Sequence, residues 1–164
     1  MVAIAGYLLF RPDKLFVDDP VDESLEGAFR TTAALVPPTT ATPEASIGST
    51  APVTGPVALA AGRFEGLQHQ AAGTATLYEQ AGDFLLRFED DTDIQNGPDL
   101  YVWLLAADTY EGGAPAVYLD LGKLKGNLGG QNYQLPQEFD PEVHRTVLIW
   151  CLRFRVPFAA ASLE

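Results

Sequence analysis

The only cysteine of this 164-residue chain, Cys151, lies inside an apolar run of β-branched and aromatic residues, 146–158 (TVLIWCLRFRVPF). The composition of this run predicts a strand. Residues of a strand alternate between two faces, so Cys151 shares a face with Arg153 and Arg155. Their positive charges would favour a reactive thiolate. Alternatively, Cys151 packs as a small, inert hydrophobic residue, as buried free cysteines usually do.

The opposite face of this predicted strand is the one expected to point into the core. It consists of five large apolar residues: Leu148, Trp150, Leu152, Phe154 and Val156. We therefore expect Cys151 to point away from Trp150.

A glycine-containing segment, residues 123–133 (KLKGNLGGQNY), is the candidate cover for the face that carries Cys151. Its glycines permit close backbone approach, and its amide side chains supply hydrogen-bond donors and acceptors. The alternative is that these amides only join a long connection between strands. The residues predicted to surround Cys151 and to contact a cofactor are His69, Lys125, Asn127, Gln131, Asn132, Tyr133, Trp150 and Arg153.

Other chemistries have less support in the sequence. Asp90, Asp91 and Asp93 resemble a calcium loop, but Gln95 and Asn96 break the EF-hand pattern, so a solvated acidic loop is expected and no metal site is predicted. The only serine beyond residue 50 is Ser162, and no hydrolase triad is supported. Whether the chain is an enzyme stays open.

The cofactor is not identified by the sequence. Cys151 and His69 could bracket a haem iron, but the chain lacks a Cys-x-x-Cys-His motif and a small sandwich would need a large cavity.

Short apolar runs separated by turn residues fill the chain from residue 57 to its end. They predict strands at 57–64, 73–79, 84–89, 100–106, 116–121, 146–155 and 158–163. No helix of ten or more residues interrupts them. The expected fold is all-β, an antiparallel β-sandwich or a barrel-like sandwich.

The preceding part of the chain divides into two predicted segments. Residues 1–30 begin with a nine-residue apolar run, 2–10, which is too short to span a bilayer and is either the tail of a longer membrane helix or an interfacial helix. Val21, Leu25 and Phe29, spaced by four, favour a short helix. Residues 31–55 are rich in proline and threonine and predict a linker to the sandwich at 56–164.

The net charge of −12 and the pI near 4.4 argue against nucleic acid as a partner. The charge is uneven, because residues 116–164 carry five acids and five bases whereas residues 1–115 carry seventeen acids and five bases. A small anionic ligand would be least repelled near the C-terminal strands.

Four blocks together resemble one family, the DM-thirteen domain associated with DOMON domains. They are Gly62 to Phe64 followed by His69 and Gly73; NGPDLYVWL at 96–104; LDLGKLKGN at 119–127 continuing into GQNYQLP at 130–136; and VLIWC at 147–151 with Phe154, Val156, Phe158 and Leu163. The resemblance covers residues 56–163. Three features depart from it: the long linker, Ala159 with Ala160, and His144.

This resemblance implies an electron-transfer role in which Cys151 acts as a bare thiol or holds a prosthetic group such as haem. Residues 6–16 are similar to the segment that follows a membrane helix in bacterial members of the family. An extracytoplasmic domain of the cell envelope, tethered to the membrane by an N-terminal anchor, is therefore expected, with an unidentified redox or envelope protein as partner. The rival hypothesis is a non-catalytic binding or scaffold domain whose cysteine is packed and inert.

Overall fold

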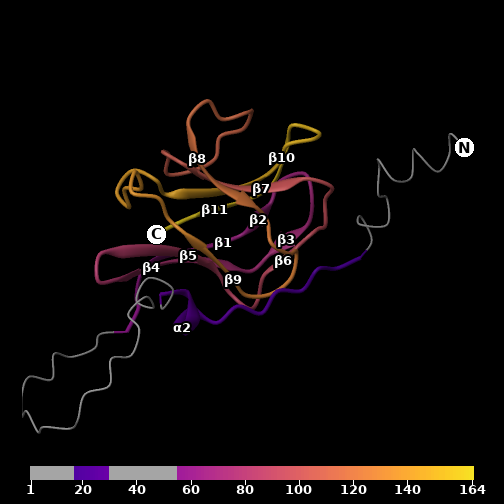
Figure 1. Cartoon of the computed structure of the whole chain (residues 1–164). Helices are drawn as coiled ribbons and strands as arrows, with labels where there is room; N and C mark the ends of the chain where they lie inside the picture. The colour runs from indigo at the N-terminus through magenta and orange to yellow at the C-terminus, as the bar shows by residue number, and fades with distance from the viewer. Residues whose placement is uncertain (1–16, 30–54) are drawn as a thin grey trace, which may run out of the picture.

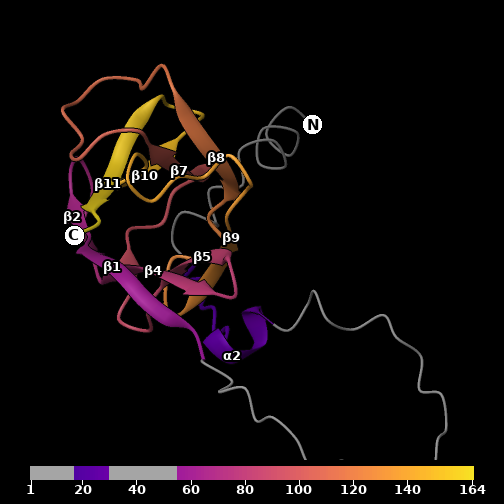
Figure 2. The same cartoon turned by 90° about the vertical axis from the view of Figure 1, so that its left-hand side faces the viewer.

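Two antiparallel sheets face each other and form a β-sandwich (Figures 1 and 2). The structure is a computed structural model that describes residues 17–29 and 55–164. The first sheet has the order β1-β4-β5-β9, formed by β1 (Val57–Arg63), β4 (Thr74–Gln80), β5 (Asp83–Phe88) and β9 (Gln131–Gln134). The predicted fold class is confirmed.

The second sheet carries the cysteine. Its order is β2-β11-β10-β7-β8, formed by β2 (Glu65–Gly66), β11 (Val156–Ser162), β10 (Thr146–Cys151), β7 (Leu100–Leu105) and β8 (Tyr118–Lys123). A small third sheet pairs β3 (Ala71–Ala72) with β6 (Asp93–Ile94).

Strands β7 and β10 are buried on both faces. Val102, Val147 and Ile149 point into the main core between the sheets, whereas Trp103 and Trp150 belong to a second cluster on the outer face. This double burial explains why every residue of β10 is buried and why its sequence lacks a polar face.

The predicted strand at 146–155 is too long. Strand β10 ends at Cys151, and residues 152–155 form the turn that leads into β11. Arg155 has a φ of 56° in this turn, and its N–H donates to the carbonyl of Cys151 at 2.8 Å. Strand β9 also differs from expectation, because its polar sequence QNYQ predicts part of a connection rather than a strand.

The described part of the N-terminal segment is mostly extended. Helix α2 covers only Leu25–Ala28, and the Oγ of Ser24 accepts a hydrogen bond from the N–H of Gly27 at 3.3 Å. Val21 lies outside this helix, so the observed helix is shorter than the one predicted from the spacing of Val21, Leu25 and Phe29. No helix within the described residues is long and apolar enough to cross a membrane, and the apolar run 2–10 lies outside them.

Candidate functional site

Cys151 is the last residue of β10 and is fully buried, with none of its surface exposed. Its partners in the sheet are Leu100 of β7 and Val156 of β11. Its side chain belongs to the main core cluster, whereas Trp150 belongs to the outer cluster. The prediction that these two neighbours point to opposite faces is confirmed.

The predicted environment of the thiol is wrong in two respects. The face shared by Val147, Ile149 and Cys151 is the core face, whereas Leu152 and Phe154, expected in the core, are 46% and 55% exposed in the turn. Arg153 and Arg155 are also exposed in that turn rather than on the face of the strand that carries the cysteine. The local positive charge that was expected to favour a thiolate is therefore not part of this site.

The segment 123–133 folds back on itself through one buried amide. The side-chain oxygen of Gln131 accepts hydrogen bonds from the hydroxyl of Tyr133 at 2.6 Å and from the backbone N–H of Lys125 at 3.2 Å. Its amide nitrogen donates to the carbonyl of Gly126 at 2.9 Å. Burial raises the pKa of Tyr133 despite the opposing hydrogen bond from the Lys125 N–H, so the hydroxyl remains a donor.

Two further amides of this segment hold residues 18–24, which we call the strap. Asn127 accepts from the N–H of Asp19 at 2.7 Å and donates to the carboxylate of Asp18 at 2.9 Å. Asn132 donates its backbone N–H to Glu23 at 2.7 Å and its side-chain N–H to the carbonyl of Ser24 at 3.1 Å. Figure 1 shows the strap, in indigo, leading along the sandwich into α2.

An ionic network reinforces the strap at Glu23. The ammonium of Lys125 lies 2.8 Å from a carboxylate oxygen of Glu23, and the buried guanidinium of Arg87 donates to the carbonyl of Glu23 and to the Oδ1 of Asn132. Burial opposes the charge of Glu23, but the hydrogen bonds from Lys125 and Asn132 and the charges of Lys125 and Arg87 lower its pKa overall. Glu23 and Arg87 were not predicted as site residues.

Glycines make the close approach of the strap possible. A Cβ on Gly126 would lie 2.1 Å from the carbonyl oxygen of Asp19, and one on Gly129 would lie 2.3 Å from that of Val21. The predicted close backbone approach is therefore present, but its partner is the chain's own strap. The side-chain amides of this segment hydrogen-bond within the segment and to the strap.

A small pocket lies where this segment meets the Asn96–Leu100 turn, and we call it the Asp99 pocket. It has a volume of about 180 Å³, and its lining includes Asp19 of the strap, Asp99, Leu100, Leu124 and Asn127. The ammonium of Lys123 lies 2.8 Å from the carboxylate of Asp99, whose hydrogen bond and negative charge raise the pKa of Lys123. Since Leu100 pairs with Cys151 in the sheet, this pocket lies next to the cysteine end of β10.

The remaining predicted site residues lie elsewhere. His69 stacks on the ring of Phe158 at 3.7 Å, Trp150 stacks on Trp103 at 5.3 Å, and Arg153 is in the exposed turn. The structure thus brings together the five residues of the 125–133 segment, whereas the contacts of His69 and Trp150 are with other aromatic rings.

The acidic loop has protein partners. Asp90 forms an ion pair with Arg87 at 2.6 Å, and Asp91 accepts hydrogen bonds from the backbone and hydroxyl of Thr74. Within residues 17–29 and 55–164, no group of three histidine, cysteine or acidic side chains is arranged to hold a metal ion.

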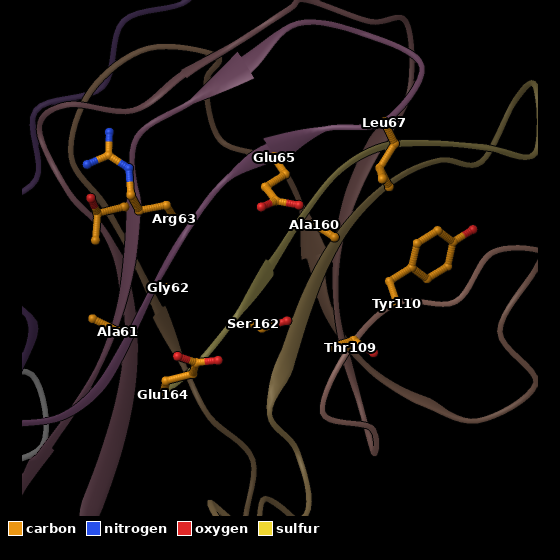
Figure 3. Close-up of a pocket in the computed structure, with 11 residues that line it drawn as sticks. Ala61, Gly62, Arg63, Glu65, Leu67, Thr109, Tyr110, Ala160, Ser162 and Glu164 are labelled. Carbon is orange, nitrogen blue, oxygen red and sulfur yellow. The ribbon is translucent and has the colours of Figure 1, made fainter.

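A larger pocket of about 510 Å³ lies beside β1, β2 and β11, away from the predicted site (Figure 3). Arg63, Glu65 and Glu164 contribute charges of both signs, and Tyr110 borders it from the loop after β7. None of the site residues predicted from the sequence lines this pocket.

Comparison with known proteins identifies the β-sandwich. A family model described as Electron transfer DM13 matches residues 63–163, more than half of the chain. No curated protein and no solved structure matches the chain. The matched range includes Cys151 and the 123–133 segment, and it excludes the strap.

Proposed function

Since the chain belongs to the Electron transfer DM13 family, we propose that it is an electron-transfer module with Cys151 as its redox centre. The observation that carries this proposal is the position of Cys151: it is the only cysteine, it lies inside the matched region, and it ends a central strand beside the Asp99 pocket.

Burial restricts the chemistry that the thiol can perform. Thiol exchange with a partner needs an accessible sulfur, and Cys151 has no exposed surface. Haem does not fit this arrangement either, because ligand pockets usually measure about 300–1,000 Å³, whereas the Asp99 pocket measures about 180 Å³. We therefore derive no step through haem.

We propose that access to Cys151 is controlled at the Asp99 pocket. Leu100 lines the pocket and is the sheet partner of Cys151, and the carbonyl of Leu100 accepts a hydrogen bond from the N–H of Leu124 at 2.9 Å. Both leucines line the pocket and pack in the same core cluster as Cys151, so we infer that they separate the thiol from the pocket. A Leu100→Ala variant should react faster with an alkylating reagent than the wild type, and an unchanged rate would contradict this route.

The location that we propose is extracytoplasmic, in a bacterial cell envelope, with a membrane anchor at the N-terminus and an envelope redox protein as partner. The support is the resemblance of residues 6–16 to the post-membrane segment of the family. Fractionation of cells that express the full chain, with protease added outside the inner membrane, tests it. Recovery of protected protein in the soluble cytoplasmic fraction would contradict the proposal.

One observation favours a second function. Cys151 is enclosed by aliphatic and aromatic core residues, an environment in which a cysteine is usually inert. A binding or scaffold domain of the envelope would need no more from it than packing.

Electron exchange with ferricyanide separates these two functions. If Cys151 is the redox centre, its thiol should pass one electron per wild-type chain to ferricyanide, which becomes ferrocyanide, and release its proton to water. A folded Cys151→Ala variant should not reduce ferricyanide. Ile149→Val, on the same buried face of β10, is the matched control and should behave as wild type. Equal electron transfer by Cys151→Ala and wild type would favour the scaffold function.

A further inference from the structure

Three aromatic rings form a continuous stack across the outer face of the second sheet. The ring of Tyr118 lies 3.9 Å from that of Trp103, with 19° between their planes. Trp103 lies 5.3 Å from Trp150, with 20° between their planes. The three residues come from the adjacent strands β8, β7 and β10, so the stack crosses three of the five strands of the sheet.

The stack runs from the surface of the protein to the neighbour of the cysteine. Tyr118 is 37% exposed, whereas Trp103 and Trp150 are 5% and 3% exposed within the outer cluster. Trp150 precedes Cys151 in the chain. One end is therefore available to a partner in solution, and the other end lies one peptide unit from the proposed redox centre.

The indole N–H of Trp103 is buried and has no hydrogen-bond partner, the only such buried side-chain atom among the described residues. Leaving such a group unpaired costs about 1–3 kcal/mol. An aromatic pair contributes about 0.5–1.5 kcal/mol beyond burial. A phenylalanine at this position could also stack without burying an unpaired N–H, but its smaller ring would bury less apolar surface in the outer cluster.

The unpaired N–H has a chemical consequence. A tryptophan that loses one electron becomes a radical cation whose N–H is strongly acidic, and it normally passes its proton to an acceptor. No protein acceptor of the described residues lies within hydrogen-bond distance of the Trp103 nitrogen. Loss of an electron from this ring is therefore not coupled to proton transfer to a described protein group.

We propose that Tyr118, Trp103 and Trp150 form an electron relay between the surface and the interior of the second sheet. A one-electron oxidant docked at Tyr118 gains one electron, and the stack holds the positive charge as a tryptophan radical cation. No bond forms or breaks and no proton moves. A one-electron reductant then restores the neutral stack. The relay rests on the proposed electron-transfer function, but not on the redox role of Cys151.

Flash photolysis of the full chain tests the relay. Photo-excited tris(bipyridine)ruthenium with persulfate supplies the one-electron oxidant, and transient absorption distinguishes tryptophan cation radicals from their deprotonated forms. The chain has only two tryptophans, so Trp103→Phe leaves Trp150 as the only source of the signal. Wild type should give the cation radical, and Trp103→Phe should lose the Trp150 signal.

Tyr118→Phe keeps the test valid if the buried variant misfolds, because Tyr118 is partly exposed. It should slow formation of the tryptophan radical, whereas Tyr78→Phe, on β4 of the other sheet, should leave it unchanged. Radical formation in Trp103→Phe and Tyr118→Phe at the wild-type yield and rate would overturn the relay. A deprotonated radical as the first species in wild type would also overturn it. Cys151→Ala should retain the radical signal, so loss of ferricyanide reduction in that variant tests the redox role of the cysteine separately.

Discussion

Gly126→Ala should release the strap while leaving the sandwich folded. The added Cβ would lie 2.1 Å from the carbonyl oxygen of Asp19, a backbone atom that cannot rotate away as a side chain would. The strap must therefore move. Gly126 lies in the connection between β8 and β9 and belongs to neither strand, so the hydrogen bonds between the strands of both sheets should remain.

The magnitude follows from the hydrogen bonds next to the clash. Displacing Asp19 breaks its N–H bond to the Asn127 side chain and the bond from the Asn127 N–H to its carbonyl, and it leaves the buried Asn127 amide without these partners. At about 0.5–1.5 kcal/mol for each of the two bonds and about 1–3 kcal/mol for a buried group left unpaired, the strap should lose about 2–6 kcal/mol of docking free energy. That loss corresponds to an equilibrium constant for strap opening that is about 30- to 20,000-fold larger, because each 1.4 kcal/mol is tenfold.

Hydrogen exchange measures this opening directly. The N–H groups of Val21 and Glu23 donate to the carbonyls of Leu128 and Gly130, so their exchange should accelerate in Gly126→Ala while that of β10 amides stays slow. Gly55→Ala is the matched control, because a Cβ there meets nothing within 4 Å. Wild-type protection of Val21 and Glu23 in Gly126→Ala would refute the proposed role of glycine in seating the strap.

Three further predictions concern the charges and the core. The lowered pKa of Glu23 contributes stability that is present above its ordinary pKa of 4.5 and is lost as the pH falls through the pKa of the folded state. Hydrogen-exchange protection of the strap, corrected for intrinsic rates, should therefore decline with acid in wild type. In Glu23→Gln this protection should be lower and should depend less on pH. Arg87→Met should lower the free energy of unfolding in urea by about 1–3 kcal/mol because its buried hydrogen bonds are lost, whereas Arg145→Met, which loses an exposed ion pair, should change it by less than about 1 kcal/mol. Cys151→Ser should destabilise the fold by about 1–3 kcal/mol because its hydroxyl would enter an apolar, fully buried site; wild-type stability in that variant would show that the site is hydrated or open.

The sequence predicted the strands better than it predicted their environment. Alternation correctly separated Cys151 from Trp150, but it could not tell which face was internal, because both faces of β10 are buried and both are apolar. The turn after Cys151 also lacked the usual signal, since Arg155 rather than glycine or asparagine adopts the positive φ. Leu152 and Phe154 therefore extended the strand pattern into a turn.

The strap could not be predicted for a different reason. Arg87 donates to the carbonyl of Glu23, 64 residues away, and nothing local in either segment indicates this contact. A lone arginine within the apolar run of β5 was the only available signal, because a buried guanidinium requires partners. The polar strand β9 is similarly explained by its tertiary partners, since Gln131 is fully buried against Tyr133 and Gly126.

The strap also changes the interpretation of the proline-rich segment. Residues 17–29 hydrogen-bond to the sandwich through the strap, and β1 is a strand of the sandwich. The predicted linker therefore joins, in sequence, two segments that both contact the sandwich. The distance between the sandwich and the proposed membrane anchor would then depend on the residues before the strap rather than on residues 31–55.

The central claim is that Cys151 is the redox centre of an electron-transfer domain, and voltammetry of the protein immobilised on an electrode tests it most directly. We predict a reversible signal from wild type and from Ile149→Val, and no signal from Cys151→Ala whose fold is verified by circular dichroism. A signal of the same potential and size from Cys151→Ala would contradict the claim and assign the cysteine to packing alone.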